Sequence, residues 1–358
     1  MAKKLMKGCE AIGEAAIQAG CRLFFGYPIT PQNEIPEYLS LRLPQVGGTF
    51  VQAESEVAAI NMLYGASGAG CRVFTSSSSP GISLMAEGLS YIAGAELPVV
   101  VVNIMRGGPG LGGILPSQSD YFQATKGGGH GDYRLLVLAP STVQEAADLT
   151  MEAFDLADHY RNPVMIVADG LIGQMMEPVE FRVGTSPEDL PEKPWATTGA
   201  QGRQPNIINS LFLAPTALEA HNWKLYAKYQ EMKKHIKYEL YNADGGCQIL
   251  VVAYGSVARI TRTAIDILAE KGIKVGLFRP ITLFPYPADA LLQAIEQTEQ
   301  VFVTELSTGQ MLEDVKAIVG ERRPVSFYGR VGGMVMGAEE LAEQIEKQVT
   351  GAAGPQGS

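Results

Sequence analysis

The sequence predicts an α/β protein with two domains, each built on a mostly parallel β-sheet. Short apolar runs alternate with helical patterns through residues 22–168, and the same alternation returns through residues 248–329. The run LPVVVVN at 97–103 is continuously apolar rather than alternating, as expected for a strand that is covered on both faces. A stretch rich in proline, glycine and polar residues separates the two regions.

The first domain is expected to span residues 1–180. Its apolar runs are short enough for strands, and the stretches between them have the length and periodicity of crossover helices. The expected strands are 22–27, 49–52, 72–75, 97–103, 135–138 and 164–168, and the expected helices are 55–69, 83–93 and 143–159.

Residues 181–245 are expected to form a linker that contains a polar helix at 217–241, with one face packed on a domain. The second domain is expected at 246–349, where glycines stand at the positions of helix C-caps. Its expected strands are 248–255, 273–280, 300–306 and 324–329, and its expected helices are 256–272, 288–297 and 309–320. Residues 350–358 are expected to be a disordered tail.

Composition disfavours several classes of protein. Apolar residues make up 46% of the 358 residues and charged residues only 18%, so the chain can bury a large core. The net charge of −10 disfavours a protein that coats nucleic acid or anionic lipid. No apolar run approaches the roughly 20 residues of a membrane span, and the first residues lack the apolar core of a secretory signal.

The cysteines are too far apart for a local metal site. Cys9, Cys21, Cys71 and Cys247 form no C-x-x-C pair, so we expect neither an iron–sulfur cluster nor a zinc or other metal site on this chain. Each is expected to be a small buried hydrophobic residue. So few cysteines fit a reducing compartment, and the expected location is the cytoplasm.

GYPITP at 26–31 directly follows the first expected strand. In a parallel α/β sheet, ligands bind beyond the carboxyl ends of the strands. Two prolines make this turn rigid, and Thr30 offers a hydroxyl group at its tip. The alternative is an ordinary turn in which Thr30 caps the next helix.

Glu54 and Glu56 lie at a junction between a strand and a helix. If the helix begins at residue 55, Glu56 shares one helical stripe with Ile60, Leu63 and Tyr64, and that stripe should face the core or a subunit interface. Glu54 points elsewhere. A carboxyl group in apolar surroundings has a raised pKa and can carry a proton at neutral pH. The alternative, a pair of acids favoured by the helix dipole, suits Glu54 better than Glu56.

Three further loops contain polar or glycine-rich sequence. TSSSSPG at 75–81 could receive a polar ligand or could only cap a helix. RGGPGLGG at 106–113 formally matches G-x-G-x-x-G, but Pro116 follows where a dinucleotide-binding motif would open a helix. Arg106 at its root could clamp a carboxylate or pair with a structural acid. His130 in GGGHG could carry protons or could be solvated or packed.

Taken together, five segments resemble one family: GYPITP, AESEVAAINMLYGA, TSSSSPG, IMRGGPG and FRPITLFPYP. The family is the alpha-type subunit of 2-oxoacid:ferredoxin oxidoreductases, in the short, separate form found in 2-oxoisovalerate (3-methyl-2-oxobutanoate) enzymes. The resemblance extends over residues 7–345. It implies that the first domain is the pyrimidine-binding half of a thiamine diphosphate site and that the second is a transketolase C-terminal-like domain.

The resemblance also implies roles for individual residues. Glu56 matches the catalytic glutamate that hydrogen-bonds N1′ of the aminopyrimidine, and Arg106 matches the arginine that binds the carboxylate of the 2-oxoacid. Thr30 matches a threonine close to both substrate and cofactor. The remaining implied cofactor contacts are Tyr27, Pro28, Ile29 and Ser79.

The implied reaction is the oxidative decarboxylation of a 2-oxoacid to acyl-coenzyme A and CO₂ with reduction of ferredoxin. A branched-chain oxoacid is favoured, and 2-oxoglutarate and pyruvate stay open. ADGLIG at 168–173 lacks the family's diphosphate and Mg²⁺ pattern. Mg²⁺ and 4Fe–4S clusters are therefore expected on partner subunits, namely a beta-type, a gamma-type and a ferredoxin-like delta subunit. Two alternatives are a component of an NAD-linked 2-oxoacid dehydrogenase and a non-catalytic scaffold or nucleotide-binding module.

Overall fold

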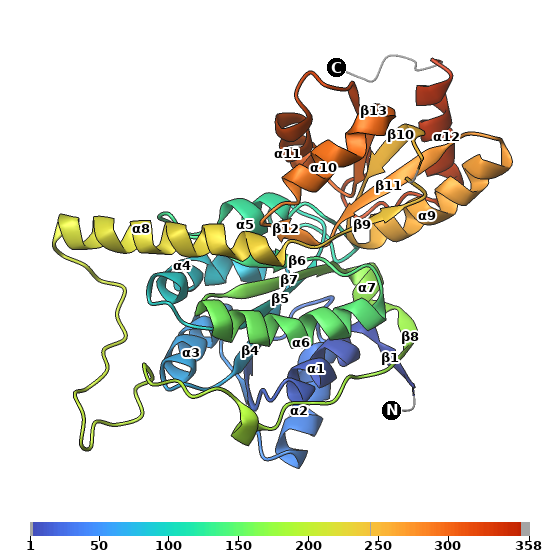
Figure 1. Cartoon of the computed structure of the whole chain (residues 1–358). Helices are drawn as coiled ribbons and strands as arrows, with labels where there is room; N and C mark the ends of the chain where they lie inside the picture. Colours follow the sequence, from blue (N-terminus) through green and yellow to red (C-terminus); the bar gives the residue numbers. More distant parts are fainter. Residues whose placement is uncertain (1–2, 244, 352–358) are drawn as a thin grey trace.

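The computed structural model describes residues 3–243 and 245–351, which contain two large sheets (Figure 1). The first sheet has seven strands in the order β12-β6-β7-β5-β4-β2-β3, and all are parallel except β12. Six of its strands match the expected ones: β2 (Leu23–Gly26), β3 (Thr49–Gln52), β4 (Val73–Ser77), β5 (Val100–Met105), β6 (Leu136–Leu138) and β7 (Val164–Asp169).

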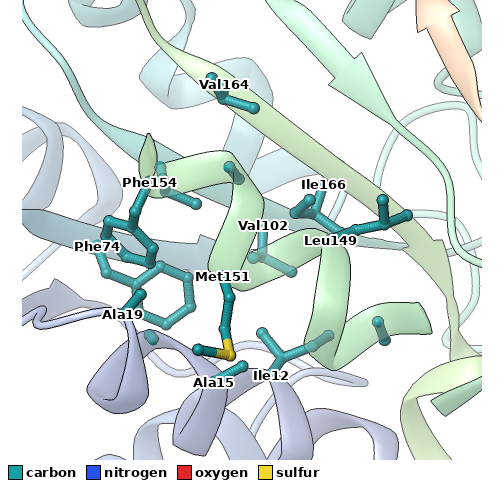
Figure 2. Close-up of a cluster of buried hydrophobic side chains, with 14 of the residues drawn as sticks. Ile12, Ala15, Ala19, Phe74, Val102, Leu149, Met151, Phe154, Val164 and Ile166 are labelled. Atoms are coloured by element: carbon teal, nitrogen blue, oxygen red, sulfur yellow. The ribbon is translucent and has the colours of Figure 1, made fainter. Parts of the chain in front are cut away.

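Helices cover both faces of this sheet, as the uninterrupted apolar strands predicted. Val100 and Val102 of β5 pack in one cluster with helices α1, α2 and α6, and part of this cluster is drawn in Figure 2. Val101 packs in another cluster with α3 and α4. The bounds are α1 (Gly8–Gln18), α2 (Glu34–Gln45), α3 (Glu56–Gly68), α4 (Pro80–Gly94) and α6 (Val143–Tyr160).

The second sheet has five strands in the order β14-β13-β10-β11-β9 and lies beside the first domain (Figure 1). One face packs against α9 and α12, and the other packs against α10 and α11. The strands are β9 (Tyr238–Tyr241), β10 (Cys247–Val252), β11 (Val275–Pro280), β13 (Thr298–Glu305) and β14 (Val325–Gly329). The helices are α9 (Gly255–Glu270), α10 (Ala288–Ala294), α11 (Gln310–Val319) and α12 (Ala338–Val349).

The polar helix expected at 217–241 is shorter than predicted. Helix α8 (Pro215–Glu231) ends early, and β9 instead pairs antiparallel with β11 at the edge of the second sheet. A strand edge far away in the sequence supplies hydrogen bonds to residues that local periodicity assigned to a helix. The expectation that α8 packs one face on a domain is met by its buried Leu225 and Tyr229.

Several elements were not predicted. They are the two-stranded sheet of β1 (Lys4–Lys7) and β8 (Met176–Val179), the helices α1, α2, α5 (Tyr121–Lys126), α7 (Gly170–Gln174) and α12, and the strand β12 (Thr282–Phe284). β12 pairs with β6, so a strand from the second half of the chain completes the first sheet. The domain borders at 180 and 245 stay a prediction.

The cysteine prediction is wrong at one position. Cys9, Cys21 and Cys247 are buried, but Cys71 is exposed because it lies in the turn between α3 and β4. None of the helices in the described part of the chain is long and apolar enough to cross a membrane. Of the tail expected to be disordered, residues 352–358 lie outside the described residues.

Candidate functional site

Four adjacent strands, β3, β2, β4 and β5, end at the same edge of the first sheet because they are parallel. Each is followed by one of the polar segments singled out in the sequence. Glu56 follows β3, Thr30 follows β2, Ser79 follows β4 and Arg106 follows β5. The fold therefore collects the predicted site residues along one edge, where α/β sheets bind their ligands.

Glu56 is the first residue of α3 and is only 5% exposed. The predicted stripe is confirmed, since Ile60 and Leu63 are buried and Glu54 is exposed. The Glu56 carboxylate lies over the start of α4: a Cβ atom on Gly81 would be 2.6 Å from Glu56 Oε1. Only a glycine lets the carboxylate lie this close to the helix.

A buried glutamine, Gln32, holds the GYPITP loop in place. Tyr27 and Pro28 are exposed at the surface, and Thr30 is half-buried. Gln32 is fully buried, donates from Nε2 to the Tyr27 carbonyl (3.3 Å) and accepts from the Ser76 hydroxyl (2.6 Å). The loop between β2 and α2 is thus fixed to β4.

Arg106 is 7% exposed and points across the strand ends rather than into solvent. Its guanidinium donates to the Thr30 carbonyl at 2.9 Å and to the Leu111 carbonyl at 3.2 Å. Its Nε has no hydrogen-bond partner although it is buried. No carboxylate of the described residues forms a salt bridge with Arg106, so its structural alternative, pairing with an acid, does not occur there.

Ser79 lies in a rare backbone conformation, with φ of 26° and ψ of −80°. Its backbone N–H donates to Asn103 Oδ1 at 3.0 Å, and its hydroxyl donates to Asp120 Oδ2 at 2.5 Å. The same hydroxyl oxygen accepts from the Arg106 backbone N–H at 3.0 Å. Burial raises the pKa of the Asp120 carboxyl, against the opposing effects of Ser79, Asn103 and Arg106.

A cavity of about 920 Å³ opens beside this network, between the two halves of the chain. From the first half it is lined by Ser79, Asp120 and the glycines that follow Arg106, and from the second half by residues including Ser307 and Gln310. Its volume is in the range of small-molecule sites. The residues after Arg106 form an irregular loop up to α5, as the position of Pro116 predicted. His130 is exposed, with Nδ1 3.3 Å from the Ser90 hydroxyl.

Sequence reasoning missed three polar residues of the candidate site: Gln32 and Asn103, which are buried, and Asp120, which is half-buried. Asn103 could have been found from the sequence, because it is a lone amide in the most apolar strand of the chain, and a buried amide needs hydrogen-bond partners. Gln32 and Asp120 could not, because their partners Ser76 and Ser79 lie 44 and 41 residues away in the sequence.

Comparison with family models and known proteins identifies the family of the chain. The model described as pyruvate flavodoxin/ferredoxin oxidoreductase, thiamine diphosphate-binding, matches residues 14–239, and the pyruvate:ferredoxin oxidoreductase core domain II model matches residues 247–341. The site and fold thus define an oxidoreductase subunit with a thiamine-diphosphate-binding domain. The chain belongs to the 2-oxoacid:ferredoxin oxidoreductase family, as an alpha-type subunit, and the predicted family and fold class are confirmed.

Individual relatives are similar over nearly the whole chain. The ketoisovalerate oxidoreductase subunit VorB of Methanothermobacter thermautotrophicus is 48% identical over 97% of this chain and 98% of its own length. The 2-oxoglutarate synthase subunit KorA of Archaeoglobus fulgidus is 36% identical over 98% of this chain and 100% of its own. These relatives do not favour the NAD-linked dehydrogenase or the non-catalytic alternative.

Two solved structures resemble the fold. The 2-oxoglutarate:ferredoxin oxidoreductase of Magnetococcus marinus, solved with 2-oxoglutarate, coenzyme A and succinyl-coenzyme A bound, has a TM-score of 0.87 and 27% identity over 97% of this chain. This chain covers 65% of that longer chain. A split-gene transketolase, with a TM-score of 0.60 and 15% identity over 96% of this chain and 98% of its own, shows the shared fold alone.

Proposed function

We propose that this chain binds the pyrimidine half of thiamine diphosphate in a complex that oxidises 2-oxoisovalerate. The reaction converts the oxoacid, coenzyme A and oxidised ferredoxin into acyl-coenzyme A, CO₂ and reduced ferredoxin. The observation that carries the substrate assignment is the 48% identity to a ketoisovalerate oxidoreductase subunit over 97% of the chain. The next relatives, at 36% identity, make 2-oxoglutarate the second candidate.

The residues around Glu56 fit the aminopyrimidine. The carboxylate is buried against Gly81 at the start of α4, and the nearby hydroxyl oxygens of Ser77 and Ser78 are buried without partners. Such unsatisfied groups favour a polar ligand. In this role Glu56 holds a proton at N1′ of the ring, and the loop of Tyr27, Pro28 and Ile29, with Thr30 and Ser79, borders the cofactor. When bound, thiamine diphosphate supplies the nucleophilic carbon and the electron sink of the decarboxylation.

Arg106 fits the carboxylate of the oxoacid. Its guanidinium is fixed by the Thr30 and Leu111 carbonyls, and its unpartnered Nε still has a donor to offer. A planar guanidinium binds a carboxylate through paired hydrogen bonds, which orients the neighbouring carbonyl for attack. Thr30 lies beside this guanidinium, because its carbonyl accepts from Arg106.

We assign the remaining cofactors to partner chains. Mg²⁺ is proposed on a beta-type subunit, and the 4Fe–4S clusters on a ferredoxin-like delta subunit, with a gamma-type subunit completing the complex. The support is that the similar proteins are themselves named as subunits. A cytoplasmic location is proposed because the four cysteines are free thiols, which suits a reducing compartment.

The test uses the reconstituted complex with Glu56→Gln. The variant should assemble but lose exchange of the thiazolium C2 proton and oxoacid oxidation, because Gln cannot hold the proton in the same way. Glu54→Gln, two residues away and exposed, is the matched control and should behave as wild type. Wild-type C2 exchange in Glu56→Gln would refute the assignment. Assays with 2-oxoisovalerate, 2-oxoglutarate, pyruvate and an aryl oxoacid decide the substrate.

A further inference from the structure

The segment that follows the glycine-rich loop is tied to the second half of the chain. Around Gln118, Ser117 Oγ donates to the Leu306 carbonyl at 3.2 Å, and Gln310 Nε2 donates to the Ser119 carbonyl at 2.6 Å. The Phe122 N–H in turn donates to Gln310 Oε1 at 2.8 Å. These contacts come from both sides of residue 120. The position of Asp120 is therefore set by the second domain.

The Asp120 side chain does not cap the helix that it precedes. Asp120 is the N-cap residue of α5, but its side chain makes no cap hydrogen bond. Ser79, at the N-cap of α4, makes none either. Capping by such residues is ordinarily favourable. Instead the two side chains bond each other at 2.5 Å, which indicates that their positions serve something other than the stability of their own helices.

Asn103 closes a triangle with these two residues. Its Nδ2 donates to Asp120 Oδ2 at 2.9 Å, while its Oδ1 accepts from the Ser79 N–H at 3.0 Å. The triangle holds Ser79 at a positive φ that a residue with a Cβ seldom adopts. Strain of this kind persists only where the surroundings fix it, and it is concentrated at functional sites.

The triangle ends at Arg106. The Ser79 hydroxyl that donates to Asp120 also accepts the backbone N–H of Arg106. Asp120, Ser79 and the backbone N–H of Arg106 thus form one continuous hydrogen-bond path. The Asp120 carboxyl oxygen accepts from both the Ser79 hydroxyl and the Asn103 amide, and two donors fix its position better than one.

We propose that Asp120 is a positioning residue for substrate binding. Through Ser79 it fixes the backbone of Arg106, and through the segment around Gln118 it links that arginine to the second domain. The proposal rests on the proposed function for the role of Arg106. Asp120 needs no contact with the substrate in this role. Its removal should therefore change how well the oxoacid binds more than how fast bound substrate reacts.

The test compares steady-state kinetics of reconstituted complexes. Asp120→Ala removes the acceptor and should raise the KM for 2-oxoisovalerate about tenfold or more, with a smaller change in kcat and none in the KM for coenzyme A. Asp120→Asn keeps an acceptor oxygen and should restore most of the loss. Asp132→Ala, an exposed aspartate of the neighbouring loop, is the matched control. Ser79→Ala, which removes the hydroxyl between Asp120 and Arg106, should reproduce the KM effect if Asp120→Ala fails to assemble.

A double-mutant cycle separates positioning from general damage. If Asp120 acts through Arg106, then Asp120→Ala adds little to the KM already raised by Arg106→Ala. The proposal would be overturned if Asp120→Ala raised the KM by the same factor in the wild-type and in the Arg106→Ala background. It would also be overturned if Asp120→Ala and Ser79→Ala both had a wild-type KM while Arg106→Ala had a raised one. A wild-type KM in Arg106→Ala would instead refute the proposed substrate contact, and the inference with it.

Discussion

Gln118 and Leu306 form a reciprocal pair of hydrogen bonds across the two halves of the chain. The Gln118 N–H donates to the Leu306 carbonyl at 2.9 Å, and the Leu306 N–H donates to Gln118 Oε1 at 3.0 Å. Gln118 Nε2 also donates to the Tyr254 carbonyl at 2.9 Å, and the side chain is 1% exposed. A single glutamine therefore satisfies buried backbone groups after both β13 and β10.

Gln118→Ala should destabilise the full-length chain by about 2 kcal/mol, because it leaves the buried Leu306 N–H without a partner and leaves the Tyr254 carbonyl with only the Ala258 N–H. Urea denaturation measures the change as a lower midpoint. Gln293→Ala, at an exposed position of α10, is the control and should leave the midpoint unchanged. Equal midpoints for the two variants would show that the reciprocal pair contributes nothing to stability.

The sequence was sufficient to predict where the site residues would gather. Glu56, Thr30 and Arg106 each follow an apolar run that is long enough for one strand, and parallel strands must bring such residues to one edge. The burial of Glu56 followed from its helical spacing to Ile60 and Leu63. These predictions need only local periodicity and the rule of parallel connection.

The hydrogen-bond partners within the site could not be predicted in the same way. Gln118 meets Leu306 across 188 residues, and no local pattern marks either of them. Strand β9 escaped prediction for the same reason, because its pairing with β11 depends on an edge that exists only in the folded chain. Long-range pairing is a property of the assembled sheet rather than of the segment.

Gly81→Ala should weaken thiamine diphosphate binding by the reconstituted complex. The new Cβ would lie 2.0 Å from Ser77 Oγ and 2.6 Å from Glu56 Oε1, so the carboxylate must move. We expect a Kd at least about tenfold higher, equivalent to about 1.4 kcal/mol, in calorimetric titration of the apo complex.

Gly65→Ala is the matched control, because a Cβ at this position in α3 meets nothing within 4 Å. It should leave the Kd unchanged and raise the stability of the helix by roughly 0.5 to 1 kcal/mol. An unchanged Kd in Gly81→Ala would mean that the Glu56 carboxylate does not contact the cofactor.

Arg279 makes the junction between the two sheets sensitive to acid. It is 2% exposed, pairs with both carboxylate oxygens of Glu145 at 2.6 and 2.7 Å, and donates from Nε to Glu239 at 2.8 Å. Burial alone would raise the pKa of the Glu145 carboxyl, but the hydrogen bonds and charge of Arg279 outweigh it, and the net pKa is lowered. A carboxylate with a lowered folded-state pKa stabilises the fold above its unfolded pKa of about 4.3, and this contribution is lost as the pH falls through the folded-state pKa.

Glu145→Gln should therefore lower stability at pH 7 by roughly 1.5 kcal/mol, the low end for hydrogen bonds to charged groups, because the Glu145 side chain is partly exposed and Glu239 still partners Arg279. As the pH falls below the unfolded pKa of about 4.3, the difference between the variant and the wild type should shrink, since the contribution of the ionised carboxyl is lost toward its lowered folded-state pKa. Thermal unfolding at several pH values measures both effects, with the exposed Glu321→Gln as control. If the difference between Glu145→Gln and wild type stayed constant from pH 7 to pH 3, the ionised pair would not be the source of the stabilisation.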